Sequence, residues 1–336
     1  MSGMDAFLQG LNTSMDVIGQ MALLVLTGFL MVRRKWIRPE TLTDLTRLLI
    51  DLVIPCAFIL AMTRSFTFDL LEQGGILALV SLGWILLSWG FGTGFYRLFP
   101  GGSKPGDRSV TAMMMISNSL YLPLPVILAV TPETLHDQAI VYISVISLPS
   151  ILIMWTLGVR LLGGKVSSST ERRKLLLNPP ILSLFAGILL SLIPGVRESA
   201  RGEPGGFGPL ATLFSAMGFL SGLLSPLAMI VLGGMIASVR RIRVPLRYVL
   251  PLAIVRLLVV PAGVYLLIRS GVTGLEGLAC TVLLLVAAAP PATNHALIAR
   301  RYGGEWELVS ALQLLLHIIA LVTLPLWLAL GLMPPS

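Results

Sequence analysis

Two short stretches of the sequence place prolines and an asparagine where a regular apolar helix is expected. Residues 117–125 read SNSLYLPLP within the apolar window 109–130, and residues 289–294 read APPATN within the window 277–299. Proline has no backbone N–H and clashes with the carbonyl group four residues earlier, so a helix cannot run unchanged through either stretch. We therefore expect an interruption in both helices, with unpaired backbone groups beside an asparagine.

Interrupted helices can bind an ion through backbone groups alone. The N-terminus of each half-helix presents free N–H groups and a partial positive charge. Its C-terminus presents free carbonyl groups and a partial negative charge. Asn118 and Asn294 add amide donors and acceptors without the cost of burying a charge. The two stretches are thus a candidate anion site, provided that they meet. The alternative is a pair of packing kinks whose asparagines satisfy freed backbone groups.

The candidate substrate-binding residues are the asparagines and prolines of the two stretches with their closest polar neighbours: Asn118, Tyr121, Pro123, Pro125, Pro290, Pro291, Asn294 and His295. The Tyr121 hydroxyl either faces a cavity or is bonded in the packed interior. His295 adjoins the second stretch, where a titratable side chain is a functional candidate. The sequence leaves open which proline of each pair marks the crossing point.

Ionisable residues within other apolar windows are candidates for ion coupling. Asp51 either binds a proton or sodium or forms an ion pair with Arg47, which lies four residues earlier on the same helix face. Arg256 either meets a substrate carboxylate with its bidentate fork, or it snorkels or pairs structurally. His317 is either a proton relay or a hydrogen-bonded packing residue.

The composition requires that these stretches lie in an integral membrane protein. Of the 336 residues, 55% are hydrophobic and 12% are charged, and the mean hydropathy of +0.89 leaves too little polar surface to cover a soluble globule. Windows of roughly 20 apolar residues match the length that a bilayer requires. Ten such windows are expected, at residues 15–32, 42–62, 74–98, 109–130, 139–162, 179–194, 210–239, 248–268, 277–299 and 308–331.

The net charge of +8 follows from membrane topology rather than from nucleic-acid binding. Most of the 24 Lys and Arg residues fall in the connections after the odd-numbered windows, whereas the opposite side holds only Arg64, Arg197, Arg201 and Arg269. Short loops rich in Lys and Arg stay in the cytoplasm. The odd-numbered connections are therefore expected inside, with both termini outside.

The polar segment 164–177 divides the chain into two halves, 1–163 and 178–336, with an odd number of windows in each. The second window contains LVIPCAFIL and the seventh LLSPLAMIV, and the proline pairs fall in the fourth and ninth. Such echoes predict an inverted repeat of two five-helix units, an arrangement common in secondary transporters.

Three segments of the second half resemble the auxin efflux carrier family. They are NPPILSLFAGILLSLIPG at 178–195, PLAMIVLGGMIA at 226–237, and the long run from APPATNHALIARRYGGEW to LPLWLAL at 289–330. The resemblance covers nearly the whole chain. It implies ten spans in two inverted repeats with crossed, proline-broken helices, a fold related to bile-acid and sodium/proton transporters. It also implies a mobile crossover domain that moves past a scaffold, and often a homodimer.

The chain departs from the family pattern at three positions. Leu122 precedes Pro123 where many members have glycine, and His295 and His317 stand where small or hydroxyl residues are expected. The bacterial branch of the family includes permeases for malate, malonate and similar carboxylates. Because of the departures, the identity of the substrate does not transfer.

These observations together predict an all-helical secondary transporter of small organic anions in the cytoplasmic membrane, coupled to protons or sodium and without a bound cofactor. A sodium/proton antiporter is the alternative, although neither broken helix contains the acid that such proteins keep. An intramembrane enzyme is less favoured, because His136, His295 and His317 show no catalytic or metal-ligand spacing. No glycine-rich loop ends in GK followed by Ser or Thr, which argues against direct use of ATP.

Overall fold

The structure is a computed structural model that describes residues 3–98, 104–119, 122–163, 179–238 and 244–332. Every regular element in these ranges is a helix, and the described backbone has one isolated β-bridge. Seven helical stretches within the described residues are long and apolar enough to cross a membrane, and two shorter apolar helices accompany them, Pro179–Ser191 and Gly277–Ala288. The predicted polytopic helical membrane protein is confirmed at this level.

The first half of the chain contains two long uninterrupted helices and three that are divided. In chain order the elements are α1 (Gly3–Arg33), α2 (Pro39–Leu48), η1 (Leu49–Val53), α3 (Ile54–Ser65), α4 (Phe68–Leu98), α5 (Pro105–Met115), α6 (Pro123–Val130), η2 (Glu133–Leu135), α7 (His136–Ile153), η3 (Met154–Gly158) and α8 (Val159–Leu161). The predicted interruption of the fourth window is the gap between α5 and α6.

The second half repeats the pattern of a divided helix near its end. Its elements are α10 (Pro179–Ser191), α11 (Val196–Arg201), α12 (Gly208–Gly222), α13 (Leu224–Ser238), α14 (Leu246–Ala253), η4 (Ile254–Val259), α15 (Val260–Arg269), α16 (Gly277–Ala288), α17 (His295–Arg301) and α18 (Trp306–Gly331). The predicted interruption of the ninth window is the gap between α16 and α17. The sequence did not predict α11, a short helix in an expected loop.

Three of the long helices contain a π-helical turn, namely η1, η3 and η4. Prolines border two of them, since Pro55 follows η1 and Pro261 follows η4, and a residue without an N–H releases a carbonyl group of the preceding turn. Single π-turns within α-helices are frequent at functional sites. Asp51 lies in η1 and Arg256 in η4, so both of these charged residues stand in a π-turn.

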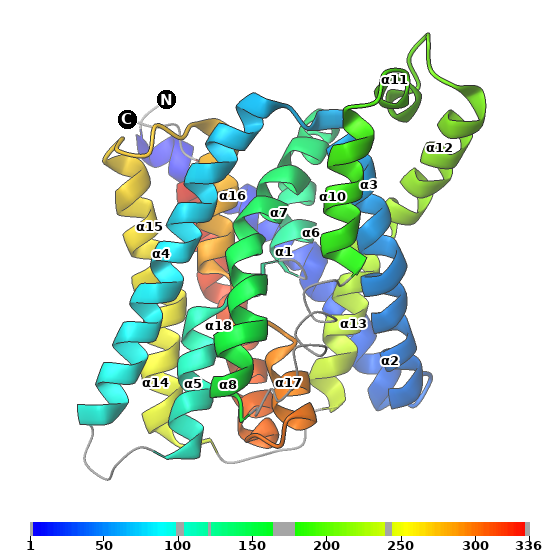
Figure 1. Ribbon diagram of the computed structural model, residues 1–336. Helices are drawn as coiled ribbons and strands as arrows, with labels where there is room; N and C mark the ends of the chain where they lie inside the picture. Colours follow the sequence, from blue (N-terminus) through cyan, green and yellow to red (C-terminus); the bar gives the residue numbers. More distant parts are fainter. Residues whose placement is uncertain (1–2, 99–103, 120–121, 164–178, 239–243, 333–336) are drawn as a thin grey trace.

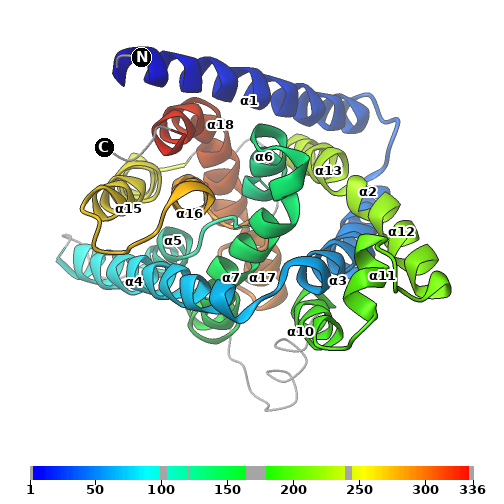
Figure 2. The same ribbon diagram turned by 90° about the horizontal axis from the view of Figure 1, so that it is seen from above.

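The helices form two groups that meet along α1 and α3. One group consists of α1 to α3 and α10 to α13, and the other contains α4 to α8 and α14 to α18 (Figures 1 and 2). Figure 2 shows α1 running along one edge of the molecule, where it packs against both α18 and α13. The start of α1 and the end of α18 lie at the same end of the bundle (Figure 1), as expected for termini on one side.

Glycines allow unusually close packing within the first group. A β-carbon at Gly28 on α1 would lie 2.0 Å from the carbonyl oxygen of Ile230, and one at Gly233 on α13 would lie 1.8 Å from that of Val25. The pair α10 and α3 is built in the same way, because a β-carbon at Gly187 would lie 2.9 Å from the carbonyl oxygen of Ile59. Small residues at such contacts let helix backbones approach closely in membranes.

Candidate functional site at the crossing of two interrupted helices

The two interruptions lie against each other and pair through their backbones. The Asn118 N–H donates to the Pro290 carbonyl oxygen at 2.7 Å, and the Ala292 N–H donates to the Ile116 carbonyl oxygen at 3.1 Å. These bonds form an antiparallel bridge between Ser117 and Pro291, and we call the segment around this bridge the crossing. Backbone groups freed by the breaks thus satisfy one another inside the protein, which is the condition for irregular backbone at membrane depth.

The crossing point falls on Pro291 in the second half and on Ser117 and Asn118 in the first. Pro123 and Pro125 instead start α6, where proline is tolerated because the first helical N–H groups have no partner. The expectation that one proline of the first pair marks the crossing point is therefore wrong. Because two of the first three residues of α6 are prolines, that half-helix presents few N–H groups to an anion.

Asn118 connects the crossing to α18. Its side-chain Nδ2 lies 3.4 Å from Nε2 of His317, and Nδ1 of His317 lies 2.7 Å from the carbonyl oxygen of Gln313, one turn earlier on the same helix. The asparagine is 2% exposed and the histidine 5% exposed. The structure therefore brings together two predicted site residues from opposite ends of the chain.

His295 connects the crossing to α5. Its Nδ1 lies 2.6 Å from the carbonyl oxygen of Ala292, and its Nε2 lies 3.1 Å from that of Ala112, in the last turn of α5. The imidazole is fully buried. A ring in this position holds the end of one half-helix beside the start of another, α17.

Arg256 is fully buried and binds the end of the half-helix α16. Its Nε donates to the carbonyl oxygen of Ala289 at 3.0 Å, and its Nη2 donates to that of Ala287. The guanidinium also lies 6.0 Å from the ring centroid of Trp84 on α4, within the range of a cation–π contact. Snorkelling is therefore excluded. Nη1 has no hydrogen-bond partner among the described residues, and the predicted contact with a substrate carboxylate stays a prediction.

Four buried polar atoms near these elements have no hydrogen-bond partner among the described residues. They are Ser117 Oγ, Asn294 Oδ1, Gln313 Oε1 and Arg256 Nη1. A buried polar atom without a partner costs about 1–3 kcal/mol, which a bound molecule can recover. The sequence analysis missed Ser117 and Gln313. The signal for Gln313 was its position four residues before His317, on the same helix face.

One predicted residue, Asp51, does not join the crossing. Asp51 is exposed, and Arg47 contacts Asp44 at 3.9 Å rather than Asp51, so the expected pair between Arg47 and Asp51 is wrong. The reason is the π-turn η1, which begins after Arg47 and changes the angular relation of residues four apart. Tyr121 lies outside the described residues.

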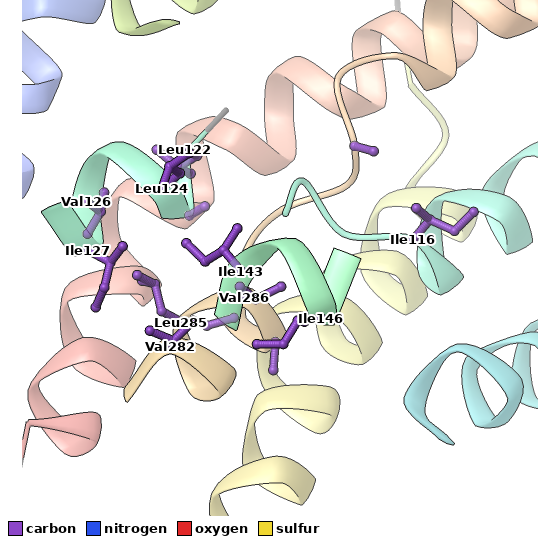
Figure 3. Packing of buried hydrophobic residues seen from close by; sticks show 14 of the residues in the cluster. Ile116, Leu122, Leu124, Val126, Ile127, Ile143, Ile146, Val282, Leu285 and Val286 are labelled. Atoms are coloured by element: carbon purple, nitrogen blue, oxygen red, sulfur yellow. The ribbon is translucent and has the colours of Figure 1, made fainter. Parts of the chain in front are cut away.

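The crossing is closed in this conformation. Beside it lies a cavity of about 30 Å³ between α1 and α13 on one side and α6 and α18 on the other, with apolar side chains and His317 in its wall. This volume admits about two water molecules. Figure 3 shows Ile127 of α6 and Ile143 of α7 packed toward Val282 and Leu285 of α16, which closes the other side of α6.

No metal centre accompanies these residues. Within the described ranges, no three His, Cys, Asp or Glu side chains are grouped in a way that holds a metal ion. A larger cavity of about 330 Å³ lies between the end of α15, the start of α16 and the end of α18, at the opposite end of α16 from the break. It contains no residue of the crossing.

Two comparisons relate the chain to known proteins. A family model described as "Membrane transport protein" matches residues 14–172 and, a second time, residues 166–328. An uncharacterized transporter of Methanothermobacter thermautotrophicus is 27% identical over 325 residues, which cover 94% of this chain and 97% of the relative.

Proposed function

Because the chain belongs to the membrane transport protein family, that of the auxin efflux carriers, we propose that it moves small organic anions, in particular carboxylates, across the cytoplasmic membrane. The chain is a transporter and not an enzyme. The anion class, the use of the crossing as the binding site and the mechanism of alternating access are the parts that we propose.

The balance of charge at the crossing is the observation that most supports an anion. Arg256 is fully buried and contacts the break of the second half, whereas residues 116–119 and 289–294 contain no Asp or Glu. The arginine offsets the partial negative charge at the C-terminus of α16, where carbonyl groups accumulate. A substrate that brings a negative charge would complete this arrangement.

The sodium/proton antiporter that the sequence left as an alternative receives less support. Such a protein needs a carboxylate at its ion site, and Asp51 is exposed on η1, in the other helix group. The unpartnered oxygens of Ser117 and Asn294 accept hydrogen bonds and suit a hydroxyl or amide group of the substrate as well as a cation.

The division into two helix groups supports alternating access. The group of α1 to α3 and α10 to α13 is the expected scaffold, and the group with the crossing is the expected mobile domain. The small cavity lies between them, bounded by α1 and α13 and by α6 and α18. Since about 30 Å³ is too small for a carboxylate, the groups must separate along this boundary to admit the substrate.

Equivalent contacts in the two halves support an inverted repeat of ten spans. Ile59 and Ile230 occupy the same position in LVIPCAFIL and LLSPLAMIV. The backbone of Ile59 is closely approached by Gly187 of α10, and that of Ile230 by Gly28 of α1, so in each case the glycine comes from the first helix of the opposite half. The two successive family matches agree with this reading. The unit boundaries at 163 and 178 stay predictions, because segment 164–177 lies outside the described residues.

Coupling to protons or sodium and assembly as a homodimer remain parts of the proposal. A negative membrane potential opposes the entry of an uncompensated carboxylate, so accumulation of the anion in the cell would require a coupling cation. The outside location of both termini belongs to the same proposal.

Flux measurements in proteoliposomes test the anion class. The purified chain is reconstituted, and uptake is measured for a panel of mono- and dicarboxylates, with the matching neutral amides as controls. We expect at least one carboxylate to be transported and its amide not to be transported. Transport of sodium in the absence of any carboxylate flux would contradict the proposal and favour the antiporter.

A further inference from the structure

The two buried histidines at the crossing face opposite kinds of partners. For His317, Nδ1 faces the carbonyl oxygen of Gln313 and Nε2 faces the amide nitrogen of Asn118. A neutral ring donates from one nitrogen and accepts at the other. His317 therefore satisfies both contacts as a neutral imidazole with its proton on Nδ1.

His295 faces two acceptors. Its Nδ1 and Nε2 lie 2.6 Å and 3.1 Å from the carbonyl oxygens of Ala292 and Ala112. A neutral imidazole has a single N–H, so one nitrogen would direct its lone pair at a carbonyl oxygen. Only the imidazolium form donates to both.

The positive charge of a protonated His295 is offset by the helix end beside it rather than by an Asp or Glu side chain. Ala112 lies in the last turn of α5, where the helix presents partial negative charge. On α5, Asp107 is paired with Arg247 at 2.8 Å, and Arg108 is exposed. Among the described residues, no carboxylate forms an ion pair with His295.

No other charged side chain that the structure describes on the neighbouring elements contacts the His295 ring. On α17 itself Arg300 is exposed, and the side chain of Arg301 is not among those that the structure describes. On α18, Glu307 is exposed, and His317 is neutral because it faces one donor and one acceptor. Arg256 on η4 is directed at Ala289 and Ala287. The two carbonyl groups are therefore the partners that hold a proton on His295.

We propose that His295 is the proton-binding residue of the crossing and that its proton links α5 to the break before α17. Loss of the proton removes one of the two hydrogen bonds and loosens this link. The inference rests on the proposed function in one respect, since it makes the proton, rather than sodium, the coupling ion. The proton is taken from water and returned to water as the crossing moves.

Nitrogen-15 NMR of the full chain in detergent tests the proposal without any substrate. The chain has three histidines, His136, His295 and His317, so selective labelling gives three imidazole rings. The variants His136→Gln and His317→Gln assign the signals. As the pH is lowered from about 8 through about 4, we expect His295 to become protonated on both nitrogens, while His317 keeps its single Nδ1 proton.

Two outcomes would overturn the proposal: a single neutral tautomer of His295 over the whole range, or protonation of His317 in its place. Because this readout needs no transport, it stays informative if no carboxylate is moved. Where flux is found, we expect an imposed pH gradient to change the rate for the wild-type chain and for His317→Gln, and to leave the residual rate of His295→Gln unchanged. A gradient response in His295→Gln equal to that of the wild type would also count against the proposal.

Discussion

A fully buried arginine without a carboxylate partner is costly unless backbone groups replace the missing anion. Arg256 meets this requirement because its Nε and Nη2 bind carbonyl groups that the proline break has freed at the end of α16. The side chain and the break thus depend on each other. The arginine neutralises the carbonyl end, and the break supplies the acceptors that keep the arginine buried.

Replacement of Arg256 by methionine should destabilise the protein and abolish most of its transport. The variant keeps the apolar stem but leaves the two carbonyl groups without donors, at a cost of about 2–4 kcal/mol in the free energy of unfolding. Thermal unfolding in detergent measures the loss. The exposed Arg108, changed to methionine, is the control. Equal unfolding temperatures for the two variants would show that the buried contacts contribute little.

At the residue scale, the sequence predicted which side chains gather and not how they pair. Asn118, Pro291 and His295 lie at the crossing, as their positions in or beside the motifs suggested. His317 also lies there, although the sequence analysis named it only as a candidate in another window. The pairing of Arg256 with backbone rather than with a substrate was not predictable, because it depends on the approach of η4 to the end of α16. Such a tertiary contact leaves no spacing signal in the sequence.

Helix packing depends on close approach at a few glycines. The contact of α1 with α13 has no room for a β-carbon at Gly28 or Gly233, since the nearest carbonyl oxygens would lie 2.0 Å and 1.8 Å away. Both obstacles are backbone atoms, which cannot rotate aside. The two helices would have to separate.

Gly28→Ala should therefore cost about 1–3 kcal/mol of stability, the usual range for overpacking. A β-carbon at Gly19, on the same helix, would have no atom within 4 Å, so Gly19→Ala is a matched control. We expect the control to be neutral or slightly stabilising, because alanine favours a helix over glycine. The unfolding temperatures of the two variants in detergent measure this difference in stability. A loss of stability in Gly19→Ala equal to that in Gly28→Ala would mean that the close contact is unimportant.

At the element scale, the apolar windows and proline pairs predicted the long helices and both interruptions. They did not predict the π-turns, nor the division of residues 208–238 into α12 and α13 at Leu223. These irregularities arise where backbone hydrogen bonding adjusts to prolines and to neighbouring helices. Hydrophobic periodicity does not record such local changes.

An ion pair crosses the boundary between the two helix groups. Arg64 at the end of α3 lies 3.7 Å from Asp137 at the start of α7, and each side chain is partly exposed. Relative movement of the groups should break this pair. Because partly exposed ion pairs contribute at most about 1 kcal/mol, the pair can shift the balance between two conformations by no more than about fivefold.

A charge reversal measures this effect. Asp137→Arg should change the rate of carboxylate flux, and the double variant with Arg64→Asp should restore it to within about twofold of the wild type. If the double variant transports no better than the single one, the pair does not act across the boundary. Surface expression is measured in parallel, so that a folding defect is not counted as a transport effect.

At the scale of the whole molecule, ten spans require both termini on the same side. The basic connections predict that this side is outside, and the start of α1 and the end of α18 lie at the same end of the bundle (Figure 1). A reporter that is active only outside the cytoplasm, fused after Ser336, should be active. An inactive outside reporter together with an active cytoplasmic one would contradict the ten-span topology.

The whole-molecule arrangement was predictable in outline because the halves echo each other in sequence. The contact between the breaks was expected from their matched positions, but its register was not. Neither proline of the first pair marks the crossing, which falls six residues before Pro123 at Ser117. Register depends on how both halves dock, and no local pattern encodes that.

The central claim is that the crossing binds the transported anion, and carboxylate flux in proteoliposomes with Asn118→Ala tests it most directly. Asn12, which is exposed on α1, provides the matched control Asn12→Ala. We expect Asn118→Ala to lower the initial rate about tenfold, because one buried hydrogen bond is worth about 1–2 kcal/mol. The control should retain the wild-type rate. Equal rates for both variants would contradict the account.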